Sequence, residues 1–185
     1  MKYLVFLLLV GFTACNSNNS STEQNTLWEY IPQNHHDNWD QDAFNIINGY
    51  LYVLKGLSTN DSVFLLASTR QLISNSDSII KKVSATDSLQ QKIVVASLHA
   101  LNGELEALIL DTHPVAVNAE VQMLTVELLN YLGQIGFQKN NIYIFNIPVD
   151  NKEDLVWLSL SKTSRNPYNI LDKELYTASQ ILQEH

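Results

Sequence analysis

The chain has 185 residues, with 11 Lys and Arg against 19 Asp and Glu, which gives a formal net charge of -8. This balance argues against nucleic acid as a partner, because phosphate backbones are bound by clustered Lys and Arg and the longest basic run is Lys81-Lys82. A chain of this length suits one domain and buries roughly 70% of its surface, so it can fold without a disulfide or a metal. Cys15 is the only cysteine, which excludes an internal disulfide.

The N-terminal sequence MKYLVFLLLVGFTA has the composition of an export signal. One cation, Lys2, precedes an apolar run that is too short to span a bilayer as a stable anchor. The alternative, a buried N-terminal helix, is disfavoured because the polar sequence that follows offers nothing to pack against. We therefore predict a signal peptide over residues 1–14.

The signal ends in Phe12-Thr13-Ala14-Cys15. This order resembles the lipobox of bacterial lipoproteins, although Phe12 stands where Leu is usual. The resemblance implies cleavage before Cys15, attachment of palmitate-like acyl chains to its sulfur, and acylation of the new amino terminus. Several acyl chains hold a protein stably at a membrane, where one chain does not. The expected partner of this end is therefore a membrane, reached through the N-terminal lipid on Cys15.

Residues 15–41 are predicted to be the lipid anchor and a polar tether. Their first part, NSNNSSTEQNT, has no apolar side chain around which to fold. Asn16 follows the cysteine directly, and by resemblance to known sorting rules this favours the outer membrane. No acidic run follows Cys15, so the periplasmic side of that membrane is favoured over the cell surface.

Residues 42–185 are predicted to form one domain with a helical body. Apolar side chains recur at helical spacing in four segments, which begin near Asp42, Asp61, Asp87 and Val117. A soft Ser-rich stretch at 74–78 is expected to bend or break the second helix. The third stripe is expected to bury Leu89, Ile93, Ala96, Ala100, Leu101, Leu105 and Leu108. Four such segments joined by short polar turns favour an up-down four-helix bundle.

The segment after the bundle has a different composition. Ile142–Ile147 and Val156–Leu158 are rich in β-branched and aromatic residues, which indicates two short strands, possible partners in a hairpin. A final short helix is predicted from four apolar residues at helical spacing, which are Leu171, Leu175, Ala178 and Leu182. The predicted fold class is therefore all-α: a four-helix up-down bundle with an irregular C-terminal tail, which forms an aromatic plug, and a final short helix.

The tail carries W-L-S followed by R-N-P-Y. This order resembles a domain of unknown function from secreted bacterial proteins, which also occurs attached to periplasmic adaptor subunits of copper/silver-type heavy-metal efflux systems. The resemblance spans about residues 42–182. It implies a structural role for the matching residues, which are Pro148, Trp157, Leu158, Ser159, Arg165, Asn166, Pro167 and Tyr168.

The departures from that domain bear on metal binding. Its sulfur-bearing positions, a Cys-Pro-Met segment and later Met and Cys residues, correspond here to Ile147, Val149, Leu175 and Ala178. Thiolates and thioethers are the ligands that select Cu(I) and related soft ions. Aliphatic replacements keep the volume that a packed core requires and remove the ligands. The resemblance therefore implies that a soft-metal site, if its relatives have one, is lost in this chain.

A second candidate metal site lies before the first predicted helix. His35 and His36 stand beside Asp37 and Asp40, and imidazole with carboxylate suits Zn²⁺, Cu²⁺ or Ni²⁺. Adjacent histidines in an extended chain point to opposite faces, so both would bind one ion only in a turn. A solvated polar linker is the favoured alternative.

No catalytic motif is present in the sequence. There is no G-x-S-x-G, P-loop or G-x-G-x-x-G, and Arg165 is expected to form an ion pair inside the tail. We therefore expect no enzyme and no cofactor. The sequence favours a lipid-anchored envelope accessory or binding module, related to efflux-associated domains, with a protein partner in the envelope. The alternative is a structural or protein-interaction lipoprotein with no metal role.

Overall fold

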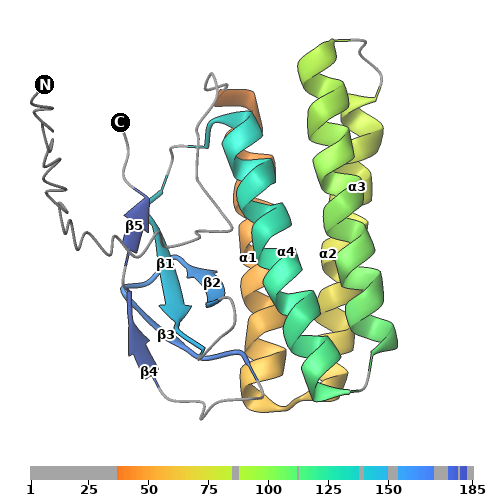
Figure 1. Ribbon diagram of the computed structural model, residues 1–185. Coiled ribbons are helices and arrows are strands. Elements are labelled where there is room, and N and C mark those ends of the chain that lie inside the picture. Colours follow the sequence, from red (N-terminus) through yellow and green to blue (C-terminus); the bar gives the residue numbers. More distant parts are fainter. Residues whose placement is uncertain are drawn as a thin grey trace, which may run out of the picture.

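The structure, a computed structural model, describes residues 37–84, 88–111, 113–137, 140–149, 154–168, 175–178 and 180–182. The described part is mostly helical, and a small region of antiparallel strands follows the helices (Figure 1). The helices are α1 (Asp37–Thr59), α2 (Ser62–Val83), α3 (Leu89–Leu110) and α4 (Pro114–Ile135). The strands are β1 (Ile142–Ile147), β2 (Leu155–Ser159), β3 (Thr163–Arg165), β4 (Leu175–Thr177) and β5 (Gln180–Leu182). The predicted signal peptide, Cys15, His35 and His36 lie outside the described residues.

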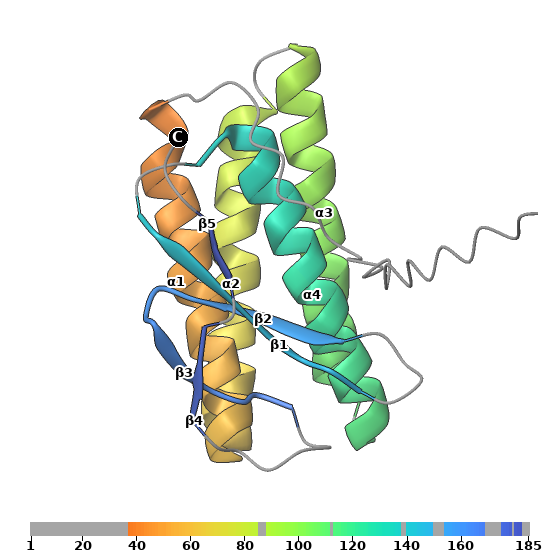
Figure 2. The ribbon, with the colours of Figure 1, turned by 60° about the vertical axis from the view of Figure 1, so that its left-hand side comes forward.

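Each helix runs antiparallel to the one before it, and the chain turns back at alternate ends (Figure 2). α1 packs on α2, α2 on α3, and α3 on α4. Two glycines on α1 let the first pair come close together. A Cβ on Gly49 would lie 2.7 Å from Leu72 Cδ1, and one on Gly56 would lie 2.7 Å from Leu65 Cα. Even a methyl group would therefore force a shift at both points.

Local capping interactions begin and end the helices. The Asp61 carboxylate accepts a hydrogen bond from the Phe64 N–H at 2.9 Å and starts α2. Ser88 and Gln91 form a reciprocal capping box at the start of α3. Gly136 ends α4 in the left-handed conformation, with a φ of 63°. Each of these caps therefore satisfies one or two of the backbone groups that a helix end leaves unpaired.

The strands form two small antiparallel sheets. In the first sheet β1 lies between β2 and β5, and its register pairs Tyr143 with Ser159 and Ile147 with Leu155. In the second sheet β3 pairs with β4. The first sheet covers the side of the molecule where α1 and α4 meet (Figure 1). Its buried residues continue the helical core without a break.

The fold class is only partly as predicted. Four helices are present, but the strands mean that the described fold is not all-α. The expected strands over Ile142–Ile147 and Val156–Leu158 are confirmed, and β2 extends one residue further at each end. α1 begins at Asp37 instead of Asp42, so it takes in the end of the predicted tether. In a closed four-helix bundle, helices alone would cover the apolar side chains of α1 and α4. Here the first sheet packs against that side instead.

The predicted final short helix is wrong, because two strands occupy its place. Leu175 pairs with Arg165 across β4 and β3. The Tyr176 ring meets Trp157 edge-on, with ring centroids 5.7 Å apart. These partners lie far back in the sequence, so an amphipathic helical pattern in the last segment cannot reveal them. The backbone conformation there is decided by tertiary pairing instead of local periodicity.

The expected break in α2 at 74–78 does not occur, and the helix continues through this stretch. Ser76 is buried, and its hydroxyl donates to an α3 carbonyl at 3.5 Å. Asn102 of α3 donates through Nδ2 to Asp77 Oδ1 at 3.0 Å. The polar residues that weaken the helix as an isolated segment therefore join it to its neighbour.

α3 buries only part of the predicted stripe: Leu101, Leu105 and Leu108 are buried as predicted. Leu89 and Ile93, expected in the core, are 74% and 39% exposed, and Ala96 and Ala100 are also exposed. The prediction was wrong at these four positions because α3 is apolar on two faces, so periodicity does not say which face the core takes. α3 is also long and apolar enough to cross a membrane by length and composition, a test that core helices of soluble proteins pass too. Its buried residues are Val94, Leu98, Leu101, Asn102, Leu105 and Leu108.

Candidate functional site

A groove runs along the solvent side of the α1–α2 pair. Its volume is about 570 Å³, which is within the range of small-molecule sites. No charged side chain lines it, so it presents hydrogen-bonding and aromatic groups in a neutral setting. The lining residues are Asn45, Asn48, Gly49 and Tyr52 of α1 and Phe64, Ala67, Ser68, Gln71 and Asn75 of α2.

The close approach of α1 and α2 at Gly49 shapes this groove. Gly49 has no room for a Cβ beside Leu72, so it presents only backbone to the groove. Ala67 on α2 contributes no more than a methyl group. The longer amide and aromatic side chains project beyond these two small residues. A hollow between two helices results, and its depth depends on Gly49.

Carboxamides supply most of the hydrogen-bonding groups of the groove, and each makes one bond of its own. Gln41 Nε2 donates to Asn45 Oδ1 at 3.1 Å. Gln71 Nε2 donates to Asn75 Oδ1 at 2.9 Å, and Asn48 Nδ2 donates to a carbonyl of α1 at 2.9 Å. Within the described residues, these bonds leave the Nδ2 groups of Asn45 and Asn75 for a ligand. The carbonyl oxygens of Asn48 and Gln71 provide acceptors beside those donors.

Tyr52 and Phe64 form the aromatic end of the groove. Their ring centroids are 6.2 Å apart and their planes make an angle of 82°, which is an edge-to-face contact. Lys55 Nζ lies 5.4 Å from the Phe64 ring centroid, so a cation–π contact also holds this ring. Tyr52 is 55% exposed, which leaves aromatic surface available to an apolar part of a ligand.

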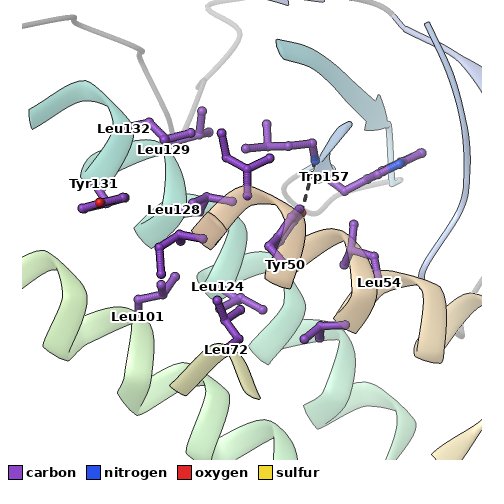
Figure 3. Close-up of a cluster of buried hydrophobic side chains, with 14 of the residues drawn as sticks. Tyr50, Leu54, Leu72, Leu101, Leu124, Leu128, Leu129, Tyr131, Leu132 and Trp157 are labelled. Atoms are coloured by element: carbon purple, nitrogen blue, oxygen red, sulfur yellow. Dashed lines mark hydrogen bonds between the residues drawn. The ribbon is translucent and has the colours of Figure 1, made fainter. Parts of the chain in front are cut away.

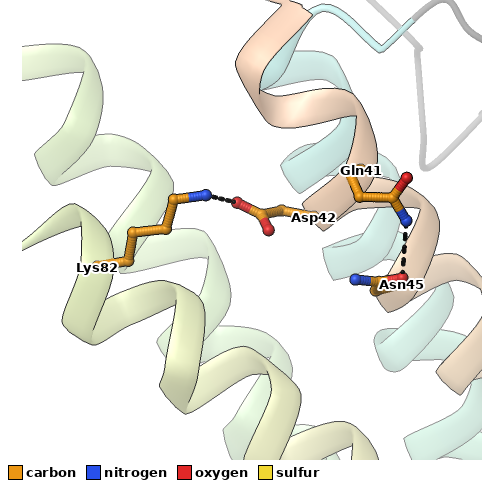
Figure 4. Close-up of polar contacts among 4 residues, drawn as sticks. All are labelled: Gln41, Asp42, Asn45 and Lys82. Atoms are coloured by element: carbon orange, nitrogen blue, oxygen red, sulfur yellow. Dashed lines mark hydrogen bonds and ion pairs between the residues drawn. The ribbon is translucent and has the colours of Figure 1, made fainter.

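A smaller recess of about 180 Å³ continues the groove and shares Asn45 and Asn75 with it. Asp42 of α1 and Lys82 of α2 also line this recess. Lys82 Nζ lies 2.7 Å from Asp42 Oδ2 (Figure 4). Because the Lys82 side chain is 64% exposed, the pair contributes little to stability. It does balance the two charges, so the recess is neutral overall.

The W-L-S and R-N-P-Y residues build an aromatic cluster around Trp157, which is fully buried. The Trp157 ring stacks on Phe145 at a centroid distance of 5.1 Å. Tyr168 and Tyr176 meet the same ring edge-on. Its Nε1 donates to Ser164 Oγ at 3.1 Å. Every group of Trp157 is therefore used in packing, so this cluster is part of the core and offers no binding surface.

The Tyr50 hydroxyl fastens this cluster to the helices. It bonds Thr125 Oγ1 at 2.8 Å and accepts the Leu158 N–H at 3.2 Å, so α1, α4 and β2 meet at one atom. Figure 3 shows Tyr50 among the buried side chains, with its hydroxyl directed toward the tail beside Trp157. Thr125 Oγ1 donates its proton to a carbonyl of α4, so Tyr50 is the donor between the two side chains. Burial raises the pKa of Tyr50 well above that of a free tyrosine, and the hydroxyl therefore keeps its proton.

Gln122 of α4 makes a second junction with the tail. Its Oε1 accepts the Val156 N–H at 2.8 Å and the Tyr168 hydroxyl at 3.0 Å. Its Nε2 donates to the Asp154 carbonyl at 3.0 Å. The single Tyr168 O–H proton is shared between Gln122 Oε1 and the Val156 carbonyl. Asn166 Oδ1 accepts the Tyr168 N–H at 2.9 Å, which sets the R-N-P-Y turn. One amide therefore satisfies three polar groups of the tail.

The aliphatic residues at the four sulfur positions lie in different environments. Ile147 is buried in β1, whereas Leu175 of β4 is 66% exposed. Val149 and Ala178 are half-buried. The expectation of a filled core is therefore met at Ile147 and not at Leu175. Arg165 is exposed on β3, and no acidic residue in the described part of the chain pairs with it, so its expected ion pair is absent there.

Across the described ranges, no three His, Cys, Asp or Glu side chains come together as they would around a metal ion. His113 instead caps α4, where its Nδ1 accepts the Val115 N–H at 3.3 Å. His99 is exposed on α3. His113 therefore has a structural role at the start of α4, and His99 faces solvent.

No family model matches the chain, and no curated protein or solved structure matches it either. The candidate site is therefore argued from its geometry. Sequence reasoning did not single out its amides, although Asn45 and Asn48 lie one helical turn apart, as do Gln71 and Asn75. The sequence does not show that the amide pair on α1 and the amide pair on α2 line the same groove.

Proposed function

We propose that this chain is a lipid-anchored binding module of the cell envelope that takes a neutral oligosaccharide and catalyses no reaction. The observation that carries the proposal is the α1–α2 groove, about 570 Å³ in volume and lined without a charged side chain. Carboxamides bond the hydroxyl groups of a sugar as donors and acceptors. The exposed ring surface of Tyr52 suits the apolar face of a sugar ring.

In this proposal, Cys15 holds the protein at the periplasmic side of the outer membrane and the tether ends where α1 begins. The helices act as an up-down bundle with the sheet along its α1–α4 side, a frame that keeps the groove in shape. Cys15→Ser is expected to release the protein from the membrane fraction. If the variant stays membrane-bound, the lipid anchor is wrong, and the groove proposal is unaffected.

The proposal keeps the relation to efflux-associated domains but not their soft-metal site. The support is that Ile147 and Leu175 have neither sulfur nor nitrogen in their side chains. The test is to purify the protein without a His-tag and to measure bound metal after separate additions of Cu(I), Cu(II) and Zn(II). Stoichiometric Cu(I) binding that survives His35→Ala with His36→Ala would contradict the loss of the soft-metal site. Binding that the double variant abolishes would instead place metal handling in the tether and leave that loss unchallenged.

Ligand binding is tested with the mature chain from residue 15 carrying Cys15→Ser. Chitotriose is the neutral sugar probe, and a capped Gly-Ser peptide of similar size is the comparison. We expect chitotriose at about millimolar concentration to shift the side-chain amide NMR signals of Asn45 and Asn75. Asn75→Leu should weaken this binding, whereas Asn130→Leu, which changes an exposed amide on α4, should not.

Two outcomes would contradict the ligand assignment. If the peptide shifts the same amide signals and chitotriose does not, the groove takes peptide backbone instead of sugar. If neither probe shifts them at concentrations up to about 10 millimolar, which corresponds to negligible affinity, the groove is a surface hollow between two helices.

A further inference from the structure

The outward face of α3 carries a second regular apolar pattern, which we call the outer seam. Beginning at Leu89, it continues through Ile93, Ala96, Ala100, Gly103, Ala107 and Leu110. The steps alternate between four and three residues, which is the heptad spacing of helices that pack against another helix along their length. Leu89 and Leu110 are 74% and 81% exposed, so the outer seam has no cover within the described residues.

The inner face of α3 shows what such a pattern does when it is covered. Val94, Leu98, Leu101, Leu105 and Leu108 follow the same alternation and are buried. They face α2 and α4, the two helices packed on α3. α3 therefore has two helix-packing faces, and this chain fills one of them.

Gly103 adds an independent observation about the outer seam. A Cβ built on it would meet nothing within 4 Å, in contrast to Gly49 and Gly56, which have no room for one. A glycine inside a helix is destabilising relative to alanine. Nothing in the described part of the chain requires Gly103, whereas a helix that approaches α3 closely from outside would.

The charges beside the outer seam are negative. The carboxyls of Glu104 on α3 and Glu120 on α4 lie close to one another, and Glu127 lies near them. Partial burial and these two neighbours raise the pKa of Glu104 to about 7. α4 contains no Lys or Arg, and α3 contains only Lys92. Among the described residues of α3 and α4, the side of the outer seam that faces α4 therefore has carboxyl groups and no cation to balance them.

We infer that the outer seam is the docking surface for an amphipathic α-helix of a partner protein, with Lys or Arg beside the apolar face of that helix. The small residues in the middle of the outer seam admit large apolar side chains of the partner. A cation of the partner faces the Glu104–Glu120 pair. The inference is independent of the α1–α2 groove and of the proposed sugar.

The same observations argue against two other occupants. In a two-fold symmetric dimer formed through the outer seam, the Glu104–Glu120 pair of one copy would approach the same pair of the other copy. No cation would then balance these carboxyls. A membrane would offer an apolar phase, but the carboxyls beside the outer seam would have to enter its interface. A helical partner with basic residues satisfies both the spacing and the charge.

The test uses two synthetic helical peptides of about 21 residues, or three heptads, with Leu at a and Ala at d. One carries Lys at the flanking e and g positions, and the other carries Glu. Binding of each to the mature chain with Cys15→Ser is followed by fluorescence anisotropy in about 0.15 M salt, where non-specific attraction is screened. We expect the Lys peptide to bind at least about tenfold more tightly than the Glu peptide.

Matched variants locate the contact. Gly103→Leu should weaken binding of the Lys peptide by about tenfold or more through steric exclusion, whereas Ser74→Leu, on an exposed site of α2, should not. Glu120→Gln should weaken it severalfold, and Glu106→Gln, which removes a carboxyl from the other flank of the outer seam, should weaken it too. Asp40→Asn, the same charge change on α1, should have no effect. Circular dichroism checks that each variant is folded, and Ala96→Leu replaces Gly103→Leu if the latter is not.

Three results would overturn the inference. The first is equal binding of the Lys and Glu peptides, or binding that Gly103→Leu leaves unchanged. The second is a homodimer in sedimentation that Gly103→Leu disperses, which would give the outer seam to a second copy. The third is binding of the Cys15→Ser chain to neutral phosphatidylcholine vesicles that Gly103→Leu abolishes, which would give it to a membrane.

Discussion

α3 and α4 are the same length, 22 residues, and both are predominantly apolar, but the structure covers them differently. Twelve residues of α4 are buried and only six of α3 are. α4 has helices on one side and the sheet on another, whereas α3 has neighbours on one side alone (Figure 1). The difference teaches that the composition of a helix indicates how much apolar surface it could bury. Whether that surface is buried depends on the other elements that pack against the helix.

The sheet that covers α4 depends most on Trp157, so its removal is the largest expected effect. Trp157→Ala should lower the free energy of unfolding by about 3–5 kcal/mol, because a fully buried ring leaves a cavity. Leu110→Ala on the uncovered face of α3 is the control and should change it by less than about 0.5 kcal/mol. Urea unfolding followed by circular dichroism measures both. If the two variants lowered the free energy of unfolding by similar amounts, the sheet side of α4 and the outer face of α3 would not differ in how well they are covered.

The junction at Gln122 is expected to matter next. Gln122→Ala should lower the free energy of unfolding by about 1–3 kcal/mol, because buried polar groups of the tail lose their partner. Gln134→Ala, which removes a half-exposed amide from the same helix, should cost less than about 0.5 kcal/mol. Hydrogen exchange of the Val156 amide is the second readout, and it should become faster only in Gln122→Ala. An unchanged rate would mean that Gln122 does not hold the sheet.

Two glycine substitutions sharpen the contrast between covered and uncovered helix faces. Gly103→Ala should raise the free energy of unfolding by about 0.5–1 kcal/mol, because the added methyl group meets only open space. Gly56→Ala should lower it by about 1–3 kcal/mol, because α2 backbone stands in the way. Thermal and urea unfolding compare the two. Destabilisation by Gly103→Ala would show that the outer face of α3 is already occupied within the chain.

The smallest expected effect concerns pH. The pKa of Glu104 is raised from 4.5 to about 7, first by partial burial and then by Glu120 and Glu127. Between these values the folded chain holds more protons than the unfolded chain, so this group's contribution to stability is full below about 4.5 and is lost as pH rises through 7. The difference in free energy of unfolding between wild type and Glu104→Gln should therefore change across this window. A constant difference would contradict the raised pKa.

The sequence was sufficient for elements that depend on local pattern. β1 lies where its β-branched and aromatic residues indicated, and the helical segments follow their apolar periodicity. It was insufficient wherever a segment from a distant part of the chain decides the backbone conformation or which face of a helix is buried. Leu175 became part of a strand because Arg165 lies opposite it, and Leu89 was left exposed because Val94 belongs to the face that meets the other helices.

The candidate site was harder to predict than the fold. The tail motif was visible as a pattern, but Trp157 and Tyr168 proved to be packing residues, since both rings are fully buried and the Trp157 Nε1 and the Tyr168 hydroxyl each have a hydrogen-bond partner. The groove amides are common residues at unremarkable spacing. They become a site only when α1 and α2 are brought together at Gly49, and that contact depends on Leu72 of the other helix.

The Tyr50 hydroxyl also sets an order of events during folding. Its bond to the Leu158 N–H joins residues that are 108 positions apart, and contacts of such separation form late because a long loop must close first. A chain that emerges N-terminus first can form α1 to α4 before β2 is available. During that interval Gln122 and Thr125 face solvent, and the apolar surface around them is open to aggregation. The risk of aggregation therefore falls once the strands that follow α4 have packed onto the helices.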